Sequence, residues 1–180
     1  MTGFHRAGCC CFRCTLPASV WKLSSTGNCI WTYFAGSGRS ISSDTMDNAC
    51  YAGIAGAKSV WKLNSAGALQ WDYDTPVSGN KFGIAVDNTD SVYTVGDRRA
   101  NKSVWKLNSA GAIQWDYDTG GNATGAGTDS ANNVYITGIR AGAKSVWKLN
   151  SAGAIQWDYD TGATAYSVTV NGADKVYVTG

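Results

Sequence analysis

The sequence predicts an all-β protein, a small β-propeller of four four-stranded blades. The 180 residues include 22 glycines, eight tryptophans, nine tyrosines and 13 acidic residues, and every acidic residue is Asp. Glu favours helices and Gly disfavours them, whereas Trp, Tyr, Val and Thr favour pleated strands. Composition therefore argues against a helical protein, and the placement of the aromatic residues narrows the β class to a repeat fold.

The aromatic residues recur in four copies of one unit. One tryptophan series is Trp21, Trp61, Trp105 and Trp147, and the other is Trp31, Trp71, Trp115 and Trp157. The tyrosine series are Tyr33, Tyr73, Tyr117 and Tyr159, and Tyr51, Tyr93, Tyr135 and Tyr177. Aligned on Ser-Val-Trp-Lys-Leu, the copies begin at Ser19, Ser59, Ser103 and Ser145. A period of about 42 residues is typical of propeller blades, in which these rings form the core between blades.

Each copy contains four short strands. In the third copy, a β-rich run at residues 103–107 is joined by a Gly-containing turn to residues 112–118, which alternate between apolar and polar. This pattern predicts a hairpin. A Gly-rich link and a second hairpin follow, and in the last copy the second hairpin covers residues 166–170 and 175–179. No segment shows the apolar period of 3.6 residues that a helical solenoid requires.

The repeat starts half a blade out of phase. The chain opens with an outer hairpin at residues 19–33 and closes with an inner hairpin at residues 166–179. If one blade contains both, the ring is closed by the N- and C-terminal hairpins and no sheet edge stays open. We therefore expect a four-bladed propeller over residues 19–180. Two copies that join through the same split blade into an eight-bladed ring are the alternative.

The repeats resemble two families of propeller proteins. Residues 107–119, Leu-Asn-Ser-Ala-Gly-Ala-Ile-Gln-Trp-Asp-Tyr-Asp-Thr, with copies at 63–75 and 149–161, look like the Trp-containing docking repeat of quinoprotein (PQQ-like) β-propellers. Residues 168–180 and 85–96 are similar to the Val-Tyr-Val-Thr-Gly element of bacterial SBBP-type repeats. The resemblance covers residues 19–180 and implies the propeller fold. It implies quinone-dependent catalysis only as an alternative, because the catalytic quinoproteins are much longer and use Glu, which this chain lacks.

Two sets of repeated charges are interpreted as scaffold. One set is the carboxylate pairs Asp72 and Asp74, Asp116 and Asp118, and Asp158 and Asp160. On the outermost strand of each blade, these charges keep the sheet edge from pairing with another chain. The other set is Lys22, Lys62, Lys106 and Lys148. We expect each lysine to pair with an Asp of the adjacent strand.

The loops between inner and outer hairpins form a modest basic rim. They carry Arg98, Arg99 and Arg140 together with three lysines. These arginines are the candidate binding residues, for an acidic partner or a glycan. Solvated loop charge is the alternative.

The N-terminal segment, residues 1–18, departs from the repeats and is predicted to be a Cys-rich anchor. It contains His5, Cys9, Cys10, Cys11 and Cys14, the candidate metal ligands. Cys-x-x-Cys with a further Cys and a His matches a tetrahedral zinc site, and an iron–sulfur cluster is also possible. Disulfides are the alternative, because Cys29 and Cys50 can bridge the tail or one another.

Several function classes have no support in the sequence. The formal net charge is +2 with no run of like charge, so we expect no nucleic-acid partner. No apolar stretch is long enough to span a membrane, and the N-terminus lacks the apolar region of a signal peptide. His5 is the only histidine and lies outside the repeats. A Ser-His-Asp or Cys-His site within the propeller is therefore excluded, and the chain is expected not to be an enzyme.

The sequence is thus interpreted as a structural or interaction module. Its layout resembles that of virion-associated phage proteins such as tail or receptor-binding components. That resemblance implies localisation in a virion and docking to other structural proteins through the anchor. A lectin-type propeller that binds cell-surface glycan is the first alternative, and a homo-oligomer is an expected assembly.

Overall fold

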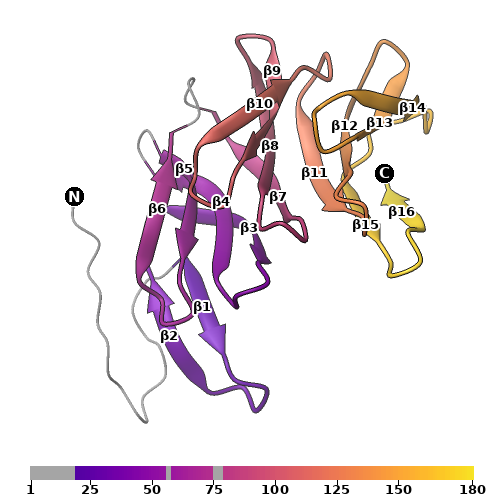
Figure 1. Ribbon diagram of the computed structural model, residues 1–180. Helices are drawn as coiled ribbons and strands as arrows, with labels where there is room; N and C mark the ends of the chain where they lie inside the picture. Colours follow the sequence, from indigo (N-terminus) through magenta and orange to yellow (C-terminus); the bar gives the residue numbers. More distant parts are fainter. Residues whose placement is uncertain (1–18, 56–57, 75–78) are drawn as a thin grey trace.

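The structure, a computed structural model, describes residues 19–55, 58–74 and 79–180, which contain strands but no helix. Successive hairpins follow one another along an open arc, from the indigo end to the yellow end of the chain (Figure 1). The all-β prediction is confirmed.

Three four-stranded antiparallel sheets form the body of the arc, and the strands of each sheet pair in chain order. Blade 1 consists of β3 (Ser37–Ser43), β4 (Ala49–Ala55), β5 (Lys58–Leu63) and β6 (Leu69–Tyr73). Blade 2 consists of β7 (Lys81–Val86), β8 (Val92–Arg99), β9 (Lys102–Leu107) and β10 (Ile113–Tyr117). Blade 3 consists of β11 (Ala123–Thr128), β12 (Val134–Ala141), β13 (Lys144–Leu149) and β14 (Ile155–Tyr159).

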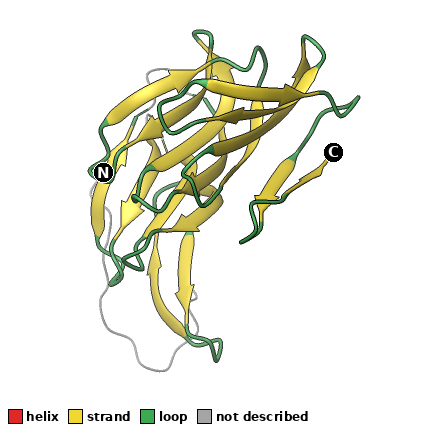
Figure 2. Ribbon diagram, turned by 45° about the vertical axis from the view of Figure 1, so that its right-hand side comes forward, coloured by secondary structure: helices red, strands yellow, loops and turns green. Residues whose placement is uncertain are grey.

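The two terminal hairpins form separate two-stranded sheets. The N-terminal hairpin is β1 (Val20–Leu23) with β2 (Cys29–Tyr33), and the C-terminal hairpin is β15 (Ser167–Val170) with β16 (Val176–Thr179). Both views show them at opposite ends of the arc (Figures 1 and 2). The predicted closure of one blade by these hairpins is therefore not observed. Each blade turns too little relative to the previous one for the arc to return to its start.

Adjacent blades pack through their inner strands and share a core. The inner strands β3, β7, β11 and β15 contact one another in that order. Between blades 2 and 3, Val104, Ile136 and Trp147 are among the fully or almost fully buried side chains. Between blades 1 and 2, the shared core includes Val60 and Leu107, both completely buried. The predicted inter-blade position of the repeated aromatics is thus confirmed inside the arc.

The turn of each outer hairpin uses glycine where a left-handed backbone is required. Gly111 has φ +83° and donates its N–H to the Asn108 carbonyl at 3.0 Å. The Asn108 side chain accepts the Ala110 N–H at 3.0 Å, which closes an Asx turn, and it also accepts the Ala112 N–H at 2.9 Å. A bulge follows, because Ile113 pairs with Leu107 while Trp115 already pairs with Lys106. The predicted hairpin is confirmed, and the same turn recurs in all four copies.

One member of a predicted tyrosine series occupies a different position. By register, Cys50 pairs with Lys62 as Tyr93 pairs with Lys106, so Cys50 stands where the later blades have tyrosine. Tyr51 pairs instead with Trp61, and their rings stack with centroids 4.8 Å apart. Equal sequence spacing placed Tyr51 in the series incorrectly, because the first repeat is shorter than the others.

Candidate functional site: the end faces of the arc

Three contacts recur along the arc, and the first joins outer hairpins of neighbouring blades. The indole N–H of Trp71 donates to the Ser109 carbonyl of the next blade at 2.9 Å. Its ring covers the turn so closely that a Cβ on Gly111 would lie 2.8 Å from it. Trp31 with Ser65 and Gly67, and Trp115 with Ser151 and Gly153, repeat the contact. Tryptophan thus locks each outer hairpin onto the next, as the resemblance implied.

The second contact joins the turns of neighbouring inner hairpins. Thr45 donates its backbone N–H to the Asp90 carboxylate at 2.9 Å. Asn88 donates in the same way to the Asn132 side chain at 3.0 Å, and Ser130 to the Asp174 carboxylate at 3.0 Å. Each turn therefore donates to a polar side chain one blade further along the chain.

The third contact lies within each blade and joins its inner and outer hairpins. Asp129 accepts hydrogen bonds from the backbone of Ala131 and Asn133 and from the Tyr135 hydroxyl at 3.0 Å. Lys148 Nζ lies 3.2 Å from the same carboxylate and 4.9 Å from the centroid of the Tyr135 ring. Burial alone would raise the pKa of Asp129, but the hydrogen bonds from Asn133, Lys148 and Tyr135 outweigh it and lower that pKa.

The other blades build the same ion pair. Lys62 pairs with Asp44 at 2.7 Å and Lys106 with Asp87 at 3.8 Å. The repeated lysines therefore do pair with Asp, but the predicted partner strand was wrong. The carboxylate comes from the inner-hairpin turn, because the strand order of each blade places that turn beside the outer hairpin.

At the N-terminal end face of the arc, the first outer hairpin lacks, among the described residues, the neighbour that covers its counterparts inside the arc. No atom of the described residues lies within 4 Å of a Cβ position on Gly27, although its φ of +83° matches that of the other turn glycines. Trp21 is 48 % exposed, whereas Trp61 and Trp105 are each 2 % exposed. A groove of about 260 Å³ is lined by residues that include Val20, Trp21, Ile41 and Tyr51.

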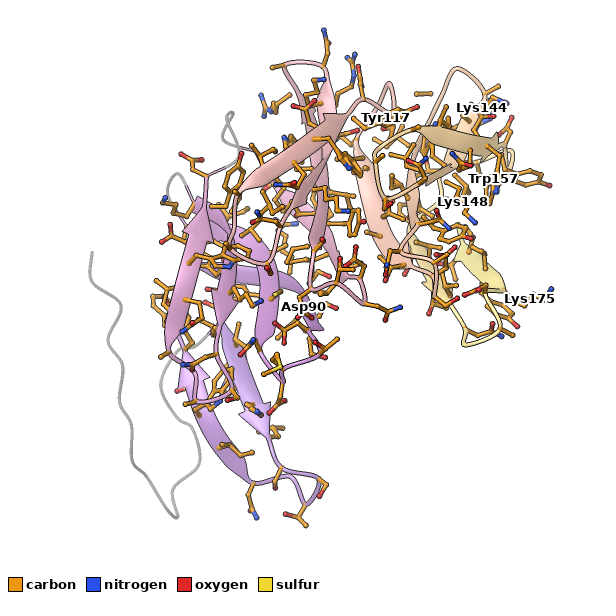
Figure 3. All side chains as sticks on the ribbon, viewed as in Figure 1. Asp90, Tyr117, Lys144, Lys148, Trp157 and Lys175 are labelled. Carbon is orange, nitrogen blue, oxygen red and sulfur yellow. The ribbon has the colours of Figure 1, made fainter. Side chains whose placement is uncertain are left out.

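At the C-terminal end face, the last tryptophan and tyrosine of the repeat series lack a described neighbouring hairpin of the kind that buries their counterparts. Trp157 is 41 % exposed and Tyr177 is 58 % exposed, whereas Tyr93 and Tyr135, the counterparts of Tyr177, are 0 % and 3 % exposed. A groove of about 530 Å³ is lined by Val146, Trp157, Asp158, Tyr159, Thr161, Val176 and Val178. Figure 3 shows Trp157 near Lys148 in the C-terminal part of the arc. The sequence repeats identified these residues, but they did not show that these residues are exposed at the ends of the arc.

The predicted basic rim is largely neutralised by aspartates of the outer strands. Arg98 makes a bidentate pair with Asp118, with both N···O distances 2.6 Å. Arg140 pairs in the same way with Asp160, and this hydrogen bond lowers the pKa of Asp160 to about 2. The lysines pair too: Lys58 with Asp72, Lys102 with Asp116 and Lys144 with Asp158.

Within the described ranges, Arg99 is the rim arginine that makes no ion pair. It is exposed. The binding role of Arg98, Arg99 and Arg140 stays a prediction, as does edge protection by the aspartates.

Lys81 is a buried cation that the sequence analysis missed. It is 0 % exposed, and its Nζ lies 3.9 Å from the centroid of the Trp105 ring. No hydrogen-bond partner for this amine exists among the described residues. Burial lowers the pKa of Lys81 to about 8, although the nearby Asp97 opposes the shift. The signal was present in the sequence, because the equivalent positions in blades 1 and 3 are Gly38 and Ala123.

The predicted metal ligands His5, Cys9, Cys10, Cys11 and Cys14 lie outside the described residues, as does the whole anchor, so the zinc and iron–sulfur hypotheses stay predictions. Cys50 is a free, buried thiol, which excludes the predicted bridge between Cys29 and Cys50. In the part of the chain that the structure covers, no three His, Cys, Asp or Glu side chains cluster as a metal site would require. That part also has no helix long and apolar enough to cross a membrane.

No protein-family model and no curated protein sequence matches this chain. Solved structures do match. Virginiamycin B lyase from Staphylococcus aureus superposes with a TM-score of 0.71 at 12 % identity, over 87 % of this chain and 54 % of the lyase. A gluconolactonase from Xanthomonas campestris gives 0.63 at 13 % identity, over 87 % of this chain and 60 % of that protein. A chain of a nidogen–laminin complex gives 0.66 at 17 % identity, over 86 % and 60 %.

These matches support the β-propeller repeat fold and correct the expectation about catalysis. The lyase and the gluconolactonase are enzymes, so proteins of this fold include catalysts, and the prediction that the chain is not an enzyme is contradicted. The lack of Glu and of a histidine in the repeats does not exclude other groups, such as the Lys81 amine. None of the three matched proteins is a virion component or a quinoprotein, so the predicted phage role has no support. The chain spans little more than half the length of these proteins, and what it shares with them is the β-propeller fold.

Proposed function

We propose that this protein is an interaction module that binds a polypeptide partner through the two end faces of its arc. One observation carries the proposal. Aromatic residues whose counterparts are buried inside the arc are exposed at its ends, as Trp21 and Tyr177 show with 48 % and 58 % exposure. Exposed clusters of this kind mark interaction sites, and Trp and Tyr are enriched among residues that dominate binding energy.

The backbone at the ends supports a polypeptide partner. Among the strands that the structure describes, β1 and β16 are each paired on one side only. An unpaired strand edge presents a row of N–H and C=O groups that an added strand satisfies. A free edge beside an apolar groove therefore fits another β-strand with its side chains better than it fits a small molecule.

The glycan alternative is less well supported by the contacts. Exposed Trp157 and Tyr159 have the rings that sugar stacking needs. Yet the equivalent tryptophans inside the arc stack on a Ser–Gly backbone turn and donate to its carbonyl. That preference is for a peptide group. The match to a chain of a nidogen–laminin complex is consistent with a propeller that binds protein.

Oxidative footprinting tests the proposal. Labelling of Trp21, Trp157 and Tyr177 is measured on the protein in an extract of its source cells, and on a purified Val178→Asp variant as the exposed reference. A charge at position 178 disfavours strand addition at β16, so the reference rings stay accessible. We expect at least severalfold less oxidation in the extract. Equal oxidation in both samples would remove the proposed function.

A second candidate function, amine chemistry on a carbonyl compound, is favoured by Lys81. No described residue hydrogen-bonds its buried amine, and burial lowers its pKa to about 8, so more of this amine is neutral near pH 7 than of an ordinary lysine. A neutral amine condenses with an aldehyde to give an imine and water, and cyanoborohydride reduction fixes the product. Mass spectrometry should find faster trapping at Lys81 than at the exposed Lys175. Faster trapping at Lys175 would reject this candidate.

A further inference from the structure

We infer that the partner of the end faces is a second copy of this chain, joined head to tail at both ends. This inference rests on the proposed function and identifies the partner that binds the two end faces. The tryptophan, strand-edge and turn contacts that one end lacks are offered by the other end, in the geometry already seen inside the arc.

The tryptophan lock is the first complementary pair. Trp157 occupies the position of Trp31, Trp71 and Trp115, which reach Ser65, Ser109 and Ser151 respectively. The corresponding turn of the N-terminal hairpin contains Ser25 and Gly27. No described residue covers Gly27, whereas Gly67, Gly111 and Gly153 each carry an indole. Trp157 of one copy therefore fits over Gly27 of the other and donates to the Ser25 carbonyl.

The strand edges are the second complementary pair. In blades 2 and 3 the inner and outer hairpins pair with Tyr93 opposite Lys106 and Tyr135 opposite Lys148. The same register places Tyr177 of β16 opposite Lys22 of β1, and Val178 opposite Trp21. β15, β16, β1 and β2 then form one four-stranded sheet, and Tyr177, Trp21 and Leu23 lose the exposure that singles them out.

The inner-hairpin turns are the third pair. Thr45, Asn88 and Ser130 each donate a backbone N–H one blade onward, to Asp90, Asn132 and Asp174. Gly172 holds the donor position in the C-terminal hairpin, and Asp47 holds the acceptor position in blade 1. Asp47 is exposed at 71 % of its side chain and pairs with Lys22, so its carboxylate is accessible to a second copy.

The curvature of the arc favours pairing with a second copy over pairing between the two ends of one chain. The arc superposes on slightly more than half of the lyase with a TM-score of 0.71, so its blades turn as those of a ring nearly twice as long. The two terminal hairpins accordingly stand far apart in both views (Figures 1 and 2). Head-to-tail pairing at both ends of two copies closes a ring, and a closed ring leaves no free edge to continue into a fibre.

A mixed-variant crosslink tests the pairing. One preparation carries Lys22→Cys and the other Tyr177→Cys, and the two are mixed, oxidised gently and digested without reduction. We expect peptides joined between positions 22 and 177, which must come from different chains. A double variant with both changes, diluted to nanomolar concentration, should give far less of this linkage. If linkage forms only within the double variant, the chain closes on itself and the inference is overturned.

Solution mass provides the second measurement. Light scattering after size exclusion should give twice the monomer mass for the wild type. Trp157→Ala should weaken the dimer by about 30-fold or more, the scale of a tryptophan hot spot. Ile113→Ala, an exposed apolar change within blade 2, should leave it unchanged. A wild-type monomer at every concentration overturns the second-copy inference. If footprinting still shows covered end faces in the extract, the proposed function survives with another protein as partner.

Discussion

Lys81 is the residue at which local electrostatics depart most from the repeat. Its amine lies over the Trp105 ring without a hydrogen bond to any described residue, and burial lowers its pKa to about 8. A buried cation without a partner costs folding free energy at neutral pH. Lysine at this position therefore lowers the stability of the fold. Such a cost is expected for a functional amine, or for a lysine held by its contact with the Trp105 ring.

Replacing Lys81 by methionine should stabilise the fold by about 3 kcal/mol at pH 7, the free energy that corresponds to the lowering of its pKa to about 8. The effect should depend on pH. Between pH 8 and pH 10.5 the unfolded chain binds a proton that the folded chain does not, so wild-type stability rises with pH in this window. Denaturant unfolding at pH 7 and pH 9.5 should show the advantage of Lys81→Met shrinking. Lys175→Met, an exposed control, should change stability little at either pH.

An advantage of equal size at both pH values would show that Lys81 is protonated throughout. The cation–π contact with Trp105 would then be strong enough to hold the charge.

At the scale of single residues, sequence spacing was informative but not sufficient. It identified most ring positions, yet it assigned Tyr51 to a series whose place Cys50 occupies. A shift of one residue along a strand moves a side chain to the opposite face of the sheet. Only the register could therefore tell these neighbours apart.

The outer hairpin is the element whose local structure could be predicted most fully from the sequence. Its Asx turn, its left-handed glycine and its bulge follow from the Asn-Ser-Ala-Gly sequence, and all were accessible to local reasoning. Its docking role was available only through the family resemblance, because nothing in one hairpin shows what lies above its glycine.

Gly111→Ala and Gly27→Ala separate the backbone role of the turn glycine from its docking role. Both residues have φ +83°, so both changes carry the same left-handed strain, about 1 kcal/mol. At Gly111 the new methyl group would also lie 2.8 Å from the Trp71 ring, and overpacking of this kind adds ~1–3 kcal/mol. Urea unfolding in a Trp157→Ala background, which removes association, should find Gly111→Ala clearly more destabilising.

Equal losses for the two variants would mean that Trp71 moves aside freely. In an otherwise wild-type chain, Gly27→Ala should weaken the dimer instead, because the methyl group occupies the place proposed for Trp157 of the second copy.

The rotation of each blade relative to the one before it decides whether the arc is open or closed. Three four-stranded sheets and two terminal hairpins make an open arc. The two ends of this arc are the surfaces that we propose to be complementary. One position at the proposed junction departs from the repeat. Asn171 stands where the three complete blades have Asp44, Asp87 and Asp129, each paired with a lysine. The junction therefore lacks the carboxylate that would pair with Lys22 of a second copy.

Asn171→Asp should strengthen the dimer. The Asn171 side chain already accepts the Ala173 and Lys175 N–H groups as Asp129 accepts those of Ala131 and Asn133, so the change keeps the turn. A carboxylate there would pair with Lys22 across the junction, worth roughly 1 kcal/mol or more in a partly buried site. Analytical ultracentrifugation should show a severalfold lower dissociation constant.

The gain should vanish in a Lys22→Met background, which removes the cation but keeps the strand. An equal gain in both backgrounds would place the effect elsewhere than at the proposed junction.

The sequence by itself determined the β class, the four copies of the repeat, the hairpin turns and the half-blade phase. These follow from short-range chemistry, since turn residues, strand alternation and aromatic spacing act within a few residues of one another. Only the tertiary structure decided that the terminal hairpins stand apart, that the rim arginines are paired, and that Lys81 is buried. Blade-to-blade rotation and burial arise from packing between segments about 40 residues apart, which no local pattern encodes.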